Sequence, residues 1–91
     1  MEYRLDLHDV HSIEDFHDKI GEVFPLPEYY GRNLDALHDI LTEFASPADI
    51  LVDGLEEASQ RIPEYLEKFK KLCKYVQIEN KDVHIYVRLL G

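Results

Sequence analysis

DILVD, residues 49–53, is the stretch of the sequence that decides the fold. It is a short continuous apolar run between turn-like neighbours, which is typical of a strand buried on both faces of a sheet. Helical patterns flank this run on both sides, and alternating patterns lie near the two ends of the chain. Because helices between successive strands favour right-handed crossovers, the sequence predicts a parallel sheet with helices packed against it.

Before this strand, the chain carries one strand pattern and two helix patterns. Residues 2–7 alternate as a half-buried strand does. Residues 13–24 form an amphipathic helix pattern, which Ser12 begins with a capping signal and a proline ends. A rigid connector, residues 25–31, leads to Asn33, which is a good N-cap for a second helix. The apolar positions of that helix are Leu34, Leu37, Ile40, Leu41 and Phe44.

After the strand, two further helix patterns and one strand pattern follow. Residues 55–62 predict a short helix, and Pro63 suits the first turn of the next one, whose apolar face runs from Tyr65 to Val76. Residues 83–90, VHIYVRLL, predict a third strand with alternate residues up to Leu89 on one face. The order strand, helix, helix, strand, helix, helix, strand predicts a single α/β domain over residues 1–91, with a three-stranded parallel sheet and packed helices.

The charge of the chain is strongly negative and unevenly distributed. The net charge of the chain is −9. Residues 1–65 hold 16 acidic and 4 basic side chains, which gives a net charge of −12. Residues 66–91 hold 3 acidic and 6 basic side chains, which gives a net charge of +3. Phosphate contacts need clustered lysine and arginine, so this composition argues against direct binding of RNA or DNA. It favours a basic protein as partner through long-range steering, although acidity can also serve solubility alone.

The sequence carries no membrane signal and no disulfide pair. No apolar run approaches the length of a membrane span, and the N-terminus lacks both a basic leader and an apolar signal core, so we expect a cytoplasmic protein without membrane binding. The single cysteine, Cys73, falls at a helical core spacing and is expected to be a buried thiol.

One face of the helix after Asn33 is compact, polar and anionic. Asp35, His38, Asp39 and Thr42 share the face opposite the apolar stripe. Carboxylates four residues apart repel each other by a few tenths of a kcal/mol. The helix dipole offsets this repulsion for Asp35 in the first turn, but Asp39 in the middle of the helix has no such compensation. A role in binding explains why a carboxylate occurs at Asp39 despite this repulsion. The alternative is that Asp39 is an ordinary solvated surface residue.

The connector before this helix strengthens the binding interpretation. Two adjacent tyrosines, Tyr29 and Tyr30, point in different directions in an extended connector, so one can be core while the other stands in solvent beside the acidic face. An exposed tyrosine next to fixed carboxylates is typical of a binding hot spot. Gly31 is expected to allow the sharp turn into the helix.

These residues resemble the signature segment of the barstar family, intracellular protein inhibitors of barnase-type secreted ribonucleases. LPEYYGRNLDALHDILT, residues 26–42, carries the clearest similarity, and the order and spacing of the elements match over essentially the whole chain. The resemblance implies a barstar-like fold. It also implies that the helix and its connector plug a ribonuclease active site, that Asp39 enters the phosphate-binding pocket with support from Asp35, and that Tyr29 packs on the loop of the catalytic histidine.

The resemblance predicts a partner and a set of contact residues. The expected partner is a basic extracellular-type ribonuclease or a ribonuclease toxin in a 1:1 complex, which would make the chain an immunity protein or antitoxin that is a monomer when free. No cofactor is implied. The expected partner-binding residues are Tyr29, Gly31, Asn33, Asp35, His38, Asp39, Thr42 and Phe44.

Several residues depart from the family pattern at the expected binding edge. His38 and Phe44 stand where the family has tryptophans, Arg32 replaces an acidic residue and Glu43 replaces a glycine. A further acidic contact near the end of the last helix has no clear match: ungapped alignment puts Tyr75 there, and Glu79 is close by. These departures allow for a different ribonuclease as the target.

Two interpretations from other functional classes stay open. Asp35, His38 and Asp39 could bind a metal, or the two carboxylates could act as an acid and base pair, but the sequence offers no second wall for such a site and no motif of an enzyme. The fold could also serve a regulatory partner that is not a nuclease, with His38 beside two carboxylates making binding depend on pH.

The histidines His8, His11, His17 and His84 are expected at the surface or at strand edges.

Overall fold

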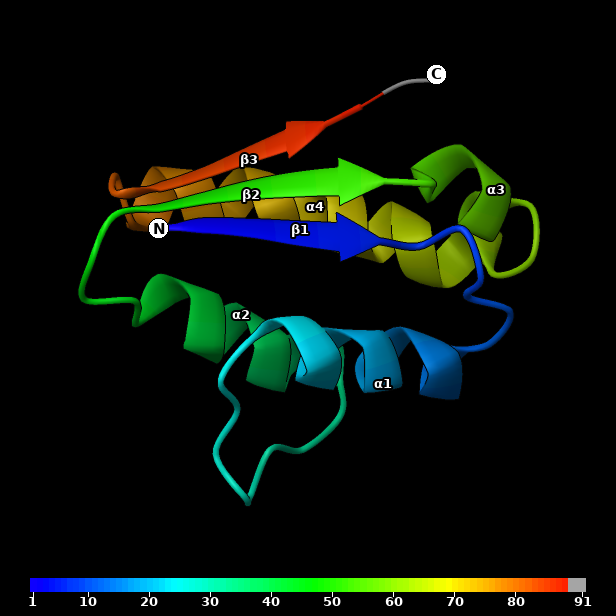
Figure 1. The fold of residues 1–91 in the computed structure, drawn as a ribbon, viewed down its shortest axis with the longest axis horizontal. Coiled ribbons are helices and arrows are strands. Elements are labelled where there is room, and N and C mark those ends of the chain that lie inside the picture. Colours follow the sequence, from blue (N-terminus) through cyan, green and yellow to red (C-terminus); the bar gives the residue numbers. More distant parts are fainter. Residues whose placement is uncertain (89–91) are drawn as a thin grey trace.

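Three parallel strands form one sheet in the computed structural model, which describes residues 1–88 (Figure 1). The strands are β1 (Glu2–Asp6), β2 (Ala48–Asp53) and β3 (Val83–Val87), in the order β1-β2-β3. This confirms the predicted parallel sheet. The third strand is shorter than expected, and the predicted strand residues Leu89 and Leu90 lie outside the described part of the chain.

Four helices connect the strands in pairs. They are α1 (Ile13–Val23) and α2 (Leu34–Thr42) between β1 and β2, and α3 (Leu55–Ser59) and α4 (Pro63–Glu79) between β2 and β3. Both predicted N-caps are confirmed, because the hydroxyl of Ser12 accepts a hydrogen bond from the backbone of Asp15 and the side chain of Asn33 accepts one from Ala36. Each such cap contributes about 1 kcal/mol by satisfying a helix N–H that has no partner within the helix.

The helices cover one face of the sheet, and the other face is open in the described structure. In Figure 1, α1 and α2 lie below the sheet and α4 behind it. Along β2, Ile50 and Val52 are buried, whereas Asp49 is exposed and Leu51 and Asp53 are half-buried. The expectation that residues 49–53 are buried on both faces is therefore wrong. Since the strand order never reverses, two crossovers of the same hand place both helix pairs on the same side.

The core fills the space between the covered face of the sheet and the helices. Phe16 is fully buried, and its ring meets that of Phe69 edge-on at 5.1 Å between centroids. Burying a side chain of this size contributes about 1.5–3 kcal/mol. The thiol of Cys73 is buried as expected, and burial raises its pKa to about 12, so this cysteine is a core residue without reactive character.

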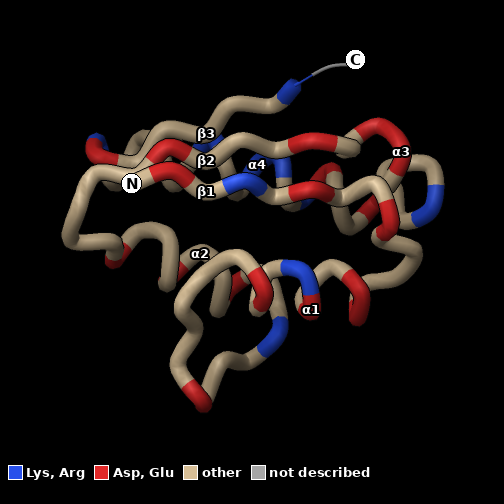
Figure 2. The backbone as a smooth tube through the Cα atoms, in the orientation of Figure 1, with Lys and Arg blue, Asp and Glu red and all other residues tan. Residues whose placement is uncertain are grey.

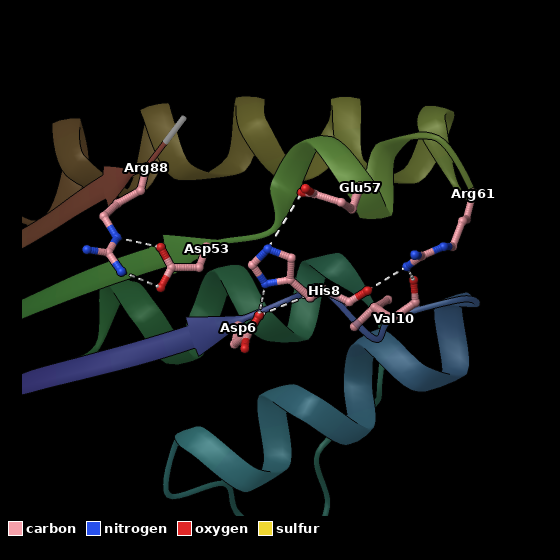
Figure 3. A network of polar contacts seen from close by, with 7 residues as sticks. All are labelled: Asp6, His8, Val10, Asp53, Glu57, Arg61 and Arg88. Carbon is pink, nitrogen blue, oxygen red and sulfur yellow. Dashed lines mark hydrogen bonds and ion pairs between the residues drawn. The ribbon is translucent and has the colours of Figure 1, made fainter. Parts of the chain in front are cut away.

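Polar contacts join the segment after β1 to α3 and the end of β3 to β2: the Nε2 of His8 lies 3.8 Å from the carboxylate of Glu57 in α3, and Arg88 pairs with Asp53 (Figure 3). The ring of His8 lies 2.6 Å from Asp6, and this hydrogen bond raises the pKa of His8 above its usual value. Arg88 donates to both oxygens of Asp53 at 2.6 and 3.2 Å, and this contact lowers the pKa of Asp53. Gly54, with φ +75°, lies so close that a Cβ there would be 2.5 Å from the backbone N of His8. The sharp turn after β2 thus requires glycine.

The outer edge of β3 is partly covered by a side chain of α4. The backbone N–H of Ile85, which points away from β2, donates to the amide oxygen of Gln77 at 2.9 Å. The amide nitrogen of Gln77 in turn donates to the carbonyl of Cys73.

No helix within residues 1–88 is long and apolar enough to cross a bilayer.

Candidate protein-binding site

A buried histidine anchors the connector that precedes α2. His17 is only 1% exposed, so the expectation that it lies at the surface is wrong. Its Nδ1 lies 2.8 Å from the hydroxyl of Tyr30 in the connector, and its Nε2 lies 2.5 Å from the hydroxyl of Tyr65 in α4. A neutral imidazole has one donor and one acceptor nitrogen, so the two hydroxyls satisfy both. The signal was present in the sequence, because His17 lies four residues after Ile13 and three before Ile20, on the apolar face of α1.

Burial sets the protonation states of this trio. Burial and the nearby charge of Arg32 lower the pKa of His17 to about 4, and burial raises the pKa of Tyr30 to about 12. Burial also raises the pKa of Tyr65. The trio is therefore neutral at pH 7 and fixes the connector to α1 and α4 by hydrogen bonds alone.

The neighbouring tyrosine stands in solvent. Tyr29 is 88% exposed, whereas Tyr30 is half-buried, which confirms that the two rings point in different directions. The turn into α2, however, does not use Gly31. The left-handed backbone lies one residue later, at Arg32, with φ 53°. A Cβ at Gly31 would lie 3.2 Å from the side chain of Asn33, the N-cap of α2, so a larger residue there would require this side chain to shift by a few tenths of an ångström.

Arg32 belongs to the support of the connector. Its guanidinium donates to Asp18 at 2.7 Å and to the backbone carbonyl of Glu14 at 3.2 Å, both in α1. This charge is therefore directed towards α1, and α2 itself carries acidic side chains but no lysine or arginine. Figure 2 shows red and no blue segments along α2.

Three carboxylates form a row along α2 and its C-terminal cap, which we call the acidic row: Asp35, Asp39 and Glu43. They are four residues apart, so neighbours are about 6 Å apart along the helix axis and lie on the same side. All three are exposed, and the side chain of Asp39 is 75% exposed. Within residues 1–88, no lysine or arginine forms an ion pair with any member of the acidic row. The row therefore presents a fixed negative charge to solvent.

On one side of the acidic row lies the end of α4. The Nε2 of His38 is 2.7 Å from the carboxylate of Glu79, and its Nδ1 is 3.9 Å from that of Asp39. The hydroxyl of Thr42 donates back to the carbonyl of His38, so it does not point freely to solvent. Glu79 thus joins the exposed acidic face of α2 through His38, a contact between two helices that no local spacing indicates.

On the other side of the acidic row, the connector and α2 enclose a groove of about 910 Å³, which we call the α2 groove. Phe44 is fixed in it by aromatic contacts, with ring centroids 5.7 Å from Tyr3 and 6.1 Å from Phe24. Asp39 and Glu43 form part of its lining, together with Pro25, Leu26, Pro27, Tyr29, Tyr30, Gly31, Ala36, Ile40, Phe44 and Ala45.

The predicted residues fall into four places around this helix. Tyr29, Gly31, Asp39 and Phe44 line the α2 groove; Asp35 stands at the start of the acidic row; and His38 and Thr42 lie on the side of α4, while Asn33 caps the helix. Ile40 and Glu43 also line the α2 groove but were not among the expected contact residues; Glu43, one helical turn after Asp39, was noted only as a departure from the family pattern at the binding edge. Within the described part of the chain, no three histidine, cysteine or acidic side chains are grouped to hold a metal ion.

Comparison with known proteins gives a family and a relative. The model of the Barstar (barnase inhibitor) family matches residues 1–90. YrdF of Bacillus subtilis (strain 168), which is provisionally named a ribonuclease inhibitor, is 33% identical over 79 residues, covering 86% of this chain and 87% of that protein.

Proposed function

This chain belongs to the barstar family, and on that premise we propose that it is a protein inhibitor of a ribonuclease, which it blocks by placing α2 and the connector in the active site. The proposed partner is a basic extracellular-type ribonuclease or a ribonuclease toxin, bound 1:1 by a monomer of this chain inside the cell. The proposed contacts are the eight residues expected from the sequence, with Asp39 at their centre.

The observation that carries this proposal is the exposed acidic row, with which no lysine or arginine among residues 1–88 forms an ion pair. A ribonuclease binds a polyanion, so its cleft is lined with basic groups that an exposed carboxylate can meet in place of a phosphate. Asp39 lies in the middle of the row, four residues from both Asp35 and Glu43, and its side chain is directed to solvent. Three charges on one helix match an extended basic cleft better than a site for a single ion.

The supported connector adds rigidity to this surface. Binding loses affinity for each side chain or loop that must be ordered in the complex. Here the His17 hydrogen bonds to Tyr30 and Tyr65 and the ion pair of Arg32 with Asp18 hold the connector before any partner arrives. Tyr29 is therefore presented on a preorganised loop, which favours tight binding.

The proposal is tested by titrating a barnase-type ribonuclease with this protein and following RNA cleavage at low and moderate salt. We expect stoichiometric inhibition that weakens as salt rises, because the charges steer and hold the complex. Asp39→Ala should weaken inhibition most, by about 3–5 kcal/mol, since it leaves basic groups of the enzyme buried without a partner.

Glu57→Ala is the control, because Glu57 is an exposed acid in α3, far along the chain from the acidic row. Equal losses for Asp39→Ala and Glu57→Ala would contradict an active-site plug and indicate a general charge effect. Absence of inhibition would remove the barnase-type enzyme as the target, and identification of the protein that co-purifies with this chain would then test the regulatory alternative.

A further inference from the structure

We propose that the outer edge of β3 is a second binding surface, which takes an extended, acidic segment of another protein as an additional strand of the sheet. Figure 1 shows β3 at the edge of the sheet that lies away from α1 and α2. The inference is therefore independent of the proposed function, which concerns α2 and its connector.

The backbone of β3 leaves bonding groups free on this edge. The N–H of Arg88 donates to Val52 in β2, so the N–H and C=O groups of the residue before it, Val87, and of Ile85 point outward. Gln77 accepts from the N–H of Ile85. Among residues 1–88, however, the N–H of Val87 and the carbonyl of Ile85 have no hydrogen-bond partner. One residue of an added parallel strand can bond to both groups, and such strand addition is a common mode of peptide recognition.

A groove beside this edge receives side chains of an added strand. It lies between β3 and α4, has a volume of about 270 Å³, and is called the β3 groove below. Phe69 and Cys73 of α4 form a nearly buried apolar floor, and Ile85 and Val87 form a wall. Residues of the added strand that lie level with this wall direct their side chains to the same face of the sheet, over the groove.

The charge at the β3 groove selects an acidic segment. Its lining in the described chain includes two lysines, Lys70 and Lys74, and no aspartate or glutamate. Lys70 lies 3.7 Å from Glu67, whereas Lys74 forms no ion pair within residues 1–88. Residues 66–91 carry a net charge of +3 in a chain whose net charge is −9. A glutamate fits here, because its methylene groups cover the apolar floor and its carboxylate meets a lysine.

The open face of the sheet selects the residues between these glutamates. Tyr86 is 50% exposed and lies in register with Leu51, which is half-buried on the same face. A β-branched side chain beside an aromatic one is a favourable cross-strand pair. The segment that complements both faces of the edge therefore alternates glutamate with valine or isoleucine.

A second copy of this chain fits the edge poorly. Pairing of two β3 strands about a two-fold axis would keep both α4 helices on the same face of the joined sheet. Lys70 and Lys74 of the two copies would then face each other across the junction, and two chains of net charge −9 also repel each other at long range.

Nuclear magnetic resonance of the full ¹⁵N-labelled chain tests this proposal. The probe is an acetylated and amidated peptide of six residues that alternate between valine and glutamate, and the reference peptide has lysine in place of glutamate. We expect saturable shifts from the glutamate peptide at the backbone amides of Ile85, Val87 and Arg88, and none at Ile40 and Phe44 in the α2 groove. The lysine peptide should give no saturable shifts.

Three variants separate the charge of this surface from its backbone. Lys74→Gln should raise the Kd of the glutamate peptide about fivefold, the loss expected for one partly exposed charged contact. Lys68→Gln is the matched control, because Lys68 is an exposed lysine of α4 outside the groove, and it should leave the Kd unchanged. Val87→Pro removes the outward N–H, which an edge strand tolerates, and should abolish the saturable shifts at Ile85 and Arg88.

Three results would each overturn the proposal. The first is the absence of saturable shifts along β3. The second is an equal effect of Lys74→Gln and Lys68→Gln, which would indicate general attraction between charges. The third is a set of shifts at Val87 that depends on the concentration of the chain alone, which would place a second copy at this edge. Inhibition of a ribonuclease is measured separately and neither supports nor removes this surface.

Discussion

Acidification from pH 7 to pH 4 should destabilise this protein through the buried His17. Its pKa is lowered from the ordinary 6.5 to about 4 in the folded chain, whereas unfolding returns the ring to water. Between these values the unfolded chain binds one more proton, so the free energy of unfolding falls as the pH falls. Each pH unit corresponds to 1.36 kcal/mol, which amounts to about 3 kcal/mol over the whole interval. The contribution is complete above pH 6.5 and is lost by about pH 4.

Other shifted groups act outside this interval. The pKa of His8 is raised by its hydrogen bond to Asp6, so its contribution to stability is present below pH 6.5 and is lost as the pH rises through its folded value. The pKa of Asp6 is lowered by hydrogen bonds from His8, and that of Asp53 by Arg88, so their contributions are lost only below pH 3.8. The pH dependence of stability between pH 4 and 6.5 is therefore assigned to His17 and not to these three groups.

Urea unfolding followed by circular dichroism at several pH values between 4.5 and 7 measures the effect. His17→Gln is the comparison, because its amide can still form hydrogen bonds but does not titrate in this range. The original protein should lose up to about 1.4 kcal/mol per pH unit in the steepest part, and the variant should be less stable at pH 7 with a flatter profile. Equal slopes in the two proteins would refute the assignment of this pH dependence to His17.

Two further predictions concern the N-cap of α2 and the turn after β2. Asn33→Ala removes the acceptor for the backbone N–H of Ala36 and should lower the free energy of unfolding by about 1 kcal/mol in urea titrations; no change would mean that the cap does not stabilise α2. Gly54→Ala should lower the free energy of unfolding by more than about 2 kcal/mol, because the added Cβ would stand on a left-handed backbone and lie 2.5 Å from the backbone N of His8. Gly21→Ala, where the added Cβ meets only ordinary contacts in α1, should instead stabilise by about 0.5–1 kcal/mol, and similar effects at both glycines would contradict this reasoning.

The helices and the starts of α1, α2 and α4 were predictable because they depend on neighbours in the sequence, whereas α3 ends at Ser59 and not at residue 62 as expected. Ser12 and Asn33 act on backbone groups three residues away, and Pro63 begins α4 where its fixed φ suits the first turn. The open face of the sheet was not predictable from the apolar run at residues 49–53. Whether Leu51 is covered depends on the side on which distant crossovers pass, and its own neighbours carry no information about this.

At the candidate site too, features set by neighbours in the sequence were predictable, whereas contacts between distant elements were not. The exposure of Asp35 and Asp39 follows from their helical spacing relative to Leu37 and Leu41. The pairing of His38 with Glu79 joins residues that only the packing of α2 on α4 brings together. His17 was misplaced although its spacing put it on the apolar face of α1; what no local pattern indicated is that two tyrosine hydroxyls from distant segments satisfy its nitrogens.

The parallel topology also determines when the molecule can assemble. Glu2 pairs with Asp49 and Ala48 with Val83, so every strand pairing must close a long loop before it returns any free energy. Helices form within about a microsecond, whereas folds dominated by such distant pairings take on the order of milliseconds to seconds. During synthesis, β1 and the acidic helix α2 are made well before β3 completes the sheet. The surface that we propose to meet a ribonuclease therefore becomes rigid only after α4, which holds the connector through Tyr65 and packs against α2, has been made.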